Sequence, residues 1–136
     1  MYPAKKFYQG AVEFSKHFYH DVGDMNAEEI FCAQCIDANP NVETWIRNIE
    51  REPAYSFWLP THKGRFYPDF VVKLKDGTFA VVEYKGEGLR TTEDTKEKNL
   101  LGELWALNNE PCKFLMAVKR DEHGRDISLQ IKDLLS

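Results

Sequence analysis

The chain has 136 residues, of which 43% are hydrophobic and 29% are charged, and its formal net charge is -4. This length and composition predict one globular domain with a core of its own. No apolar run approaches the roughly 20 residues that span a bilayer, and no signal-peptide pattern opens the chain, so we expect no membrane segment. The three cysteines are an odd number, which argues against a disulfide framework and is typical of the reducing cytoplasm. The acidic charge argues against tight DNA binding by this chain unaided; strong binding would belong to another domain or subunit.

Residues 1–24 are interpreted as an N-terminal extension, and residues 25–136 as the domain. The extension contains six aromatic residues that follow neither the helical nor the strand period: Tyr2, Phe7, Tyr8, Phe14, Phe18 and Tyr19. Residues 16–20 mix Lys and His with aromatic residues and could contact nucleic acid. We expect instead that the aromatic side chains pack on the domain or on a neighbouring protein.

The first helix is predicted over residues 24–37, because an Asn-Pro dipeptide follows it closely. Asn26 and, three positions later, Glu29 form the pattern of a capping box. Glu29 also lies one turn before Cys32 on a largely apolar helix, so it could equally direct its carboxylate at a sheet. Cys32 and Cys35 form a CxxC pattern, but only Cys112 remains as a third cysteine and no His pair is adjacent. We expect them to be small buried hydrophobic residues.

The next segments are predicted to be a strand over 42–48, a strand over 55–59 and a turn over 60–64 that leads into a further strand. Arg47 and Asn48, at the end of the first of these strands, are candidates for contacts with DNA phosphate. A surface salt bridge for Arg47 and a strand-end role for Asn48 are the structural alternatives.

Residues 67–86 predict a β-hairpin, since two segments rich in Val and aromatic residues flank an Asp-Gly turn. With a two-residue loop, Asp69 would pair with Tyr84, and Glu83 would point to the opposite face. With a three-residue loop that ends in Gly77 in the left-handed conformation, Asp69 would lie across from Glu83. The sequence alone allows both loops.

The two strands of this hairpin end, away from the turn, in Asp69 and in Glu83 and Lys85. Two carboxylates and an ammonium at the mouth of one hairpin are the parts of a divalent-metal phosphodiesterase site. Carboxylate oxygens suit a hard ion such as Mg²⁺ or Mn²⁺. The three-residue loop, or a bulge elsewhere, is required to bring the three side chains to one face.

A second helix is predicted from residue 92 or 95 to residue 108, with an apolar side formed by Leu100, Leu101, Leu104, Trp105 and Leu107. Lys98 lies on or beside this side, where it could extend along the apolar surface or lean toward the hairpin mouth and meet DNA phosphate. A strand over 112–118 and a helix or strand over 126–135 follow. The order predicts an α/β fold with an αβββαβ core, in which a crossover helix makes the last two strands of a mixed sheet parallel.

The sequence resembles the PD-(D/E)xK nucleases, with Pro68-Asp69 as the first half of the motif and Glu83-Tyr84-Lys85 as the second. The wider resemblance is to the C-terminal endonuclease module of type III restriction enzyme Res subunits and related DEAD/DEAH-box helicases. It extends over most of the chain to about residue 120, in the blocks 28–37, 45–48, 56–60, 66–70, 83–86, 97–98 and 102–105.

This resemblance implies a restriction-endonuclease-like fold and a Mg²⁺- or Mn²⁺-dependent endonuclease that cuts duplex DNA by in-line attack and leaves a 5′-phosphate. The residues it implies are the metal ligands Asp69, Glu83, Glu29 and the carbonyl of Tyr84, and the catalytic Lys85. Glu28 is the alternative to Glu29.

In the family, a helicase motor normally precedes this module. The sequence has no GxxxxGK[ST] phosphate loop, so we expect a helicase or translocase domain or subunit as a partner. The alternative function is a non-cleaving module of the same fold that binds nucleic acid or a protein partner.

Overall fold

The computed structural model describes residues 1–86 and 92–136 of the chain. The elements in chain order are α1 (Ala27–Ala38), β1 (Val42–Arg47), β2 (Leu59–Thr61), β3 (Gly64–Phe66), β4 (Phe70–Leu74), β5 (Phe79–Tyr84), α2 (Glu93–Asn108), β6 (Lys113–Ala117) and α3 (Ile127–Leu135).

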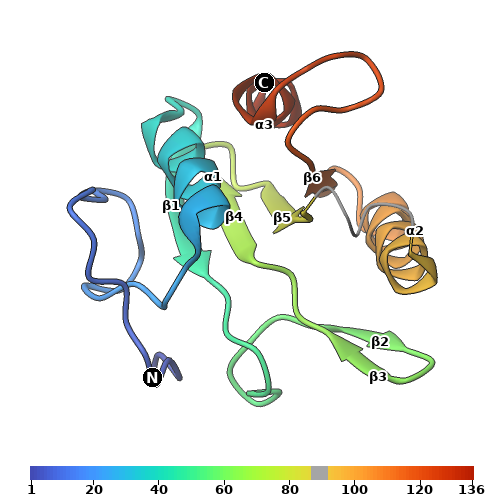
Figure 1. The fold of residues 1–136 in the computed structure, drawn as a ribbon, viewed down its shortest axis with the longest axis horizontal. Helices are drawn as coiled ribbons and strands as arrows, with labels where there is room; N and C mark the ends of the chain where they lie inside the picture. The colour runs from blue at the N-terminus through green and yellow to red at the C-terminus, as the bar shows by residue number, and fades with distance from the viewer. Residues whose placement is uncertain (87–91) are drawn as a thin grey trace.

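The main sheet has the strand order β1-β4-β5-β6 in the described part of the chain (Figure 1). β4 pairs antiparallel with β1 and β5, whereas β5 and β6 are parallel and are joined through α2. The mixed sheet and the parallel pairing across the second helix are therefore confirmed. The fold is a mixed α/β fold.

The core lies between this sheet and the two helices α1 and α3, which pack against each other. Trp45 on β1 and Phe70 and Val72 on β4 are fully buried there, together with Ile36 on α1. Cys32 is also fully buried, Cys35 packs against the core, and both thiols are free. The predicted role as a small buried hydrophobic residue is confirmed for Cys32, whereas Cys35 is only partly buried.

The first 24 residues run beside β1. Tyr8 and Phe14 pack against the core, and the Phe14 ring meets Trp45 edge to face. The N–H of Trp45 donates to the carbonyl of Lys16, and the N–H of Phe18 donates to the carbonyl of Trp45. Some of the aromatic side chains of this segment, such as Tyr8 and Phe14, thus pack on the domain, while Phe7 and Phe18 are exposed.

The predicted strand over 55–59 is wrong. Residues 55–58 form turns and irregular structure, and the strand β2 begins only at Leu59. β2 pairs with β3 in a two-stranded sheet that is separate from the main sheet and lies below α2 in Figure 1. The aromatic composition of 55–59 suggested a strand, but Phe57 packs against Trp105 and Tyr55 is exposed, and neither joins the main sheet.

The predicted apolar side of α2 is largely wrong as well. Leu100 and Leu107 are each 65% exposed, and Leu104 is exposed too. The helix instead faces β6 through the buried Gly102, where an added Cβ would lie 2.4 Å from the ring of Phe114. Because this close approach requires glycine, a small residue and not a leucine row determines which side of the helix is packed.

The C-terminal segment forms the helix α3, with Asp126 as its N-cap, which decides between the helix and strand alternatives. No helix within residues 1–86 and 92–136 has both the length and the apolar character needed to cross a membrane.

Candidate active site

The β4–β5 turn has the three-residue form. Phe70 pairs with Val82 and Lys73 with Phe79, and the N–H of Leu74 donates to the carbonyl of Thr78. Gly77 has φ +90°, which is the left-handed region that glycine adopts most easily. This turn continues the pairing so that residue 69 is opposite residue 83, as the metal-site hypothesis requires.

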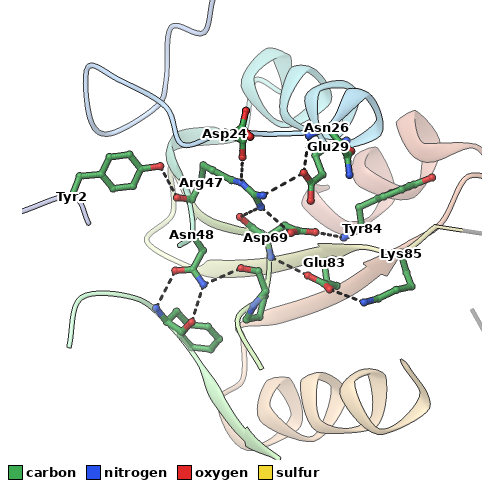
Figure 2. Close-up of polar contacts among 12 residues, drawn as sticks. Tyr2, Asp24, Asn26, Glu29, Arg47, Asn48, Asp69, Glu83, Tyr84 and Lys85 are labelled. Carbon is green, nitrogen blue, oxygen red and sulfur yellow. Dashed lines mark hydrogen bonds and ion pairs between the residues drawn. The ribbon is translucent and has the colours of Figure 1, made fainter. Parts of the chain in front are cut away.

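Asp69 and Glu83 are connected directly at the mouth of this hairpin (Figure 2). The backbone N–H of Asp69 donates to Glu83 Oε1 at 3.1 Å, and the backbone N–H of Tyr84 donates to Asp69 Oδ2 at 2.8 Å. Glu83 is only 6% exposed. The two carboxylates therefore lie together at the end of the strand pair, where both backbones help to position them.

Lys85 projects to the same place. Its Nζ lies 3.1 Å from Glu83 Oε2, and both side chains are largely buried. The backbone N–H of Lys85 donates to the carbonyl of Ala117 at the end of β6, so the neighbouring parallel strand fixes the position of this residue. The predicted convergence of Asp69, Glu83 and Lys85 is present in the structure.

Arg47 enters the site from the end of β1, in a way that the sequence did not indicate. Its Nη1 lies 2.8 Å from Asp69 Oδ1, and its Nη2 lies 3.3 Å from Glu29 Oε1. Its Nε donates to the carbonyl of Asp24 at 3.1 Å. The Arg47 side chain is 14% exposed, so it forms a mostly buried bridge between two carboxylates rather than the surface salt bridge considered from the sequence.

Glu29 fills both roles that the sequence left open. Its Oε1 accepts from the N–H of Asn26, and its own N–H donates to Asn26 Oδ1, which is the predicted capping box. The same oxygen faces Arg47 and so reaches the site from the start of α1 (Figure 2). Glu28 is exposed, and Glu29 is therefore the first-helix carboxylate that lies beside Asp69.

The three carboxyl groups of the site are crowded and buried, so their full ionisation is unfavourable. Burial, together with the nearby charge of Asp69, raises the pKa of Glu29 to about 7, although Arg47 opposes the shift. Burial and Asp69 likewise raise the pKa of Glu83 well above its usual range, against the opposing effect of Lys85. Three carboxylates share two cations, so each additional ionised carboxylate is costly here.

Asn48 lies next to Arg47 but does not face the site. Its Nδ2 donates to the carbonyls of Phe57 and Pro68 at 2.8 and 2.9 Å, and its Oδ1 accepts from the N–H of Phe57 at 3.1 Å. Asn48 is buried and joins the two ends of the segment that contains β2 and β3. These bonds correspond to the structural alternative, a strand-end asparagine, and not to a phosphate contact.

Lys98 lies on the packed side of α2, as predicted. Its Nζ is 3.0 Å from Asp94 Oδ2 and 5.5 Å from the centre of the Phe66 ring. The side chain thus extends over an aromatic surface and pairs with an acid of the same helix, which is the first of the two alternatives drawn from the sequence.

The donor chemistry of the site suits a hard divalent cation, since Asp69, Glu83 and Glu29 all present carboxylate oxygens beside Arg47 and Lys85. Within the described ranges, however, no three His, Cys, Asp or Glu side chains are grouped so as to ligate one metal ion together. Arg47 and the backbone N–H groups engage the same oxygens that a metal would use.

Comparisons of the chain with protein-family models, with curated proteins and with solved structures find no match. The functional interpretation therefore depends on the residues and their geometry.

Proposed function

We propose that this chain is a metal-dependent endonuclease that hydrolyses phosphodiester bonds of duplex DNA and has a restriction-endonuclease-like fold. The observation that carries the proposal is the position of Asp69 across from Glu83, with the Lys85 ammonium 3.1 Å from the second carboxylate. The three residue types and their order along the hairpin are those of a PD-(D/E)xK site.

Asp69, Glu83 and the carbonyl of Tyr84 would hold a Mg²⁺ or Mn²⁺ ion, with Glu29 as a further carboxylate. When bound, such an ion supplies positive charge for the phosphoryl oxygens and acidifies a water molecule. Lys85 would orient the attacking water and favour its hydroxide form, because its ammonium lies beside the carboxylates and is held there by Glu83. The same ammonium stabilises negative charge that develops on the phosphate.

Arg47 would act as a positioning residue. It holds Asp69 through Oδ1 and leaves Oδ2 turned to the backbone of Tyr84. It also offsets part of the charge of three crowded carboxylates, which keeps them together.

The biological setting that we propose is the cleavage module of a type III restriction or related helicase system, in the cytoplasm. The acidic chain needs a partner to bring it to DNA with high affinity, and a helicase or translocase domain or subunit would do so. The three free cysteines are compatible with this compartment.

A non-cleaving module of the same fold is the second candidate. The observation that favours it is that Arg47, Lys85 and two backbone N–H groups already engage the carboxylate oxygens of Asp69 and Glu83. A site of this kind could be a charged core network that needs no metal.

Nicking of supercoiled plasmid by the purified chain separates the two candidates. The nuclease proposal expects nicking with Mn²⁺ or Mg²⁺, none with excess chelator, and none for Asp69→Asn. Lys73→Ala is the matched control, because Lys73 pairs only with the surface Glu43 in the described structure. Nicking that continues at the wild-type rate in Asp69→Asn would end the nuclease proposal.

A further inference from the structure

The proposed site uses no residue of the β2–β3 hairpin. It forms a two-stranded sheet of its own and lies outside the main sheet (Figure 1). A small isolated hairpin is not stable by itself, so its presence requires contacts with the rest of the domain.

The tip of this hairpin is basic. His62, Lys63 and Arg65 are exposed, and the segment from Leu59 to Phe66 contains no Asp or Glu. The whole chain has a net charge of -4, whereas this segment by itself carries the positive charges of Lys63 and Arg65. A local cluster of positive charge can form a small phosphate-binding surface even on an acidic protein.

The hairpin is anchored firmly to α2 and β6. Phe66 is buried, and its ring meets Phe114 edge to face. The backbone N–H and the ring of His62 both contact the carboxylate of Glu97 on α2. The Arg65 guanidinium lies 4.6 Å from the centre of the Trp58 ring. These contacts hold the hairpin, with His62 and Arg65, against the rest of the domain.

The hairpin also lies close to the proposed site. β3 ends at Phe66, and Asp69 follows three residues later, so the two Cα atoms are at most about 11 Å apart. On the other side, Asp94 at the start of α2 has a lowered pKa because Lys98 bonds to it, with further contributions from the charges of Lys85 and Lys63. Lys85 and Lys63 therefore both lie within electrostatic range of Asp94.

We propose that the β2–β3 hairpin is a phosphate-binding arm for duplex DNA, in which Lys63 and Arg65 contact the backbone within a few nucleotides of the bond that the site cleaves. The inference rests on the proposed function. The Cα atoms of Arg65 and Lys63 are at most about 14 Å and about 22 Å from that of Asp69, because they lie four and six residues before it. Since one strand of a duplex rises about 3.4 Å per nucleotide, these distances correspond to about four and about six nucleotides.

The test is the affinity of the full chain for a 20-base-pair duplex by fluorescence anisotropy, in chelator and at several salt concentrations. Lys63→Gln/Arg65→Gln should bind about 10-fold more weakly at low salt, and the slope of log K against log salt should become shallower by about 1.8, the value for two phosphate contacts. Glutamine keeps part of the Arg65 stem on Trp58, and an unchanged melting temperature would show that the hairpin is intact.

The matched control is Lys75→Gln/Lys132→Gln, which removes the same charge from exposed positions elsewhere, in the β4–β5 turn and on α3. It should bind like the wild type with a small loss from net charge. Three results would each contradict the proposed arm. They are equal losses of affinity in the two double variants, no loss of affinity in the hairpin variant, and no duplex binding by the wild type.

Hydrolysis of bis(p-nitrophenyl) phosphate with Mn²⁺ separates this inference from the proposed function. This small diester does not reach the hairpin, so the hairpin variant should hydrolyse it at the wild-type rate. If the wild type neither hydrolyses it nor nicks plasmid while the binding difference persists, the nuclease proposal fails, and the hairpin contacts DNA phosphate without a cleavage site beside it.

Discussion

Arg47 and Asp69 are joined by a hydrogen bond of 2.8 Å between Arg47 Nη1 and Asp69 Oδ1, and the same guanidinium lies 3.3 Å from Glu29 Oε1. One cation from β1 thus connects the carboxylate at the start of α1 with the carboxylate at the start of β4 (Figure 2). In the absence of metal, this bridge offsets repulsion among the acids of the site.

Arg47→Ala should therefore destabilise the metal-free protein by about 2–4 kcal/mol, because it leaves buried carboxylates without their partner. Urea unfolding in chelator at pH 7.5 measures this. Mn²⁺ should raise the melting temperature of Arg47→Ala more than that of the wild type, since the ion replaces the lost positive charge. Lys73→Ala, which breaks the exposed pair with Glu43, should change stability by less than about 1 kcal/mol. An Arg47→Ala protein as stable as this control would contradict the bridging role.

The raised pKa of Glu29 predicts a specific dependence of stability on pH. The pKa is about 7 in the folded protein and 4.5 ordinarily, so between these values the folded state binds more protons than the unfolded chain. The contribution of Glu29 to the free energy of unfolding is consequently most favourable below pH 4.5 and is lost as the pH rises through 7.

Glu29→Gln isolates this effect, because glutamine can still accept the capping hydrogen bond from Asn26. In chelator, the variant should gain about 1–3 kcal/mol relative to the wild type between pH 5 and pH 8. Burial lowers the pKa of His17, which gives the opposite slope, but that slope is common to both proteins and cancels in the difference. A difference that does not vary with pH would show that Glu29 ionises normally.

Glu83 and Lys85 should fail differently when they are replaced. Glu83→Gln should lose both plasmid nicking and the rise in melting temperature that Mn²⁺ produces, because a carboxylate ligand is gone. Lys85→Met should lose nicking but keep the metal-induced rise, since a neighbouring positive charge is removed. Lys96→Met, which alters an exposed pair with Glu93, should keep both properties. If Lys85→Met lost the metal-induced rise in melting temperature and Glu83→Gln kept it, the roles assigned to Glu83 and Lys85 would be reversed.

Asn48→Ala should loosen the segment from Phe57 to Pro68, whose ends Asn48 joins through three hydrogen bonds. The expected cost is about 2–3 kcal/mol, because buried carbonyl and N–H groups lose their partner. Hydrogen exchange should become faster in β2 and β3 before the main sheet is affected. Asn109→Ala, which removes an exposed bond to the carbonyl of Trp105, is the control with a small effect. Unchanged exchange in β2 and β3 would mean that other contacts fix the hairpin.

Local sequence patterns were sufficient to predict the helix starts, the parallel strand pair and three residues of the candidate site. The capping residues Asn26, Thr92 and Asp126 mark the starts of the three described helices, since each supplies a side-chain acceptor for backbone N–H groups that a helix cannot satisfy. The helix between β5 and β6 predicted their parallel pairing, because a crossover of this length connects parallel strands. Asp69, Glu83 and Lys85 could be selected as site candidates because they are charged residues at the ends of the strands of the 67–86 hairpin. A charged side chain at a buried strand end is unfavourable unless a partner offsets its burial.

The tertiary structure decided what depends on contacts between distant segments. An Asp-Gly turn is compatible with two loop lengths, and the packing of β4 between β1 and β5 selected the one that places Asp69 across from Glu83. The leucines of α2 gave no sign that Gly102 would be the point of contact, because the close approach depends on Phe114 from another strand. Arg47 is 22 positions from Asp69 and 18 from Glu29, so only the folded chain could place its guanidinium between the two carboxylates. Such long-range ion pairs have no local pattern, since their geometry arises from burial and from strand order rather than from spacing along the chain.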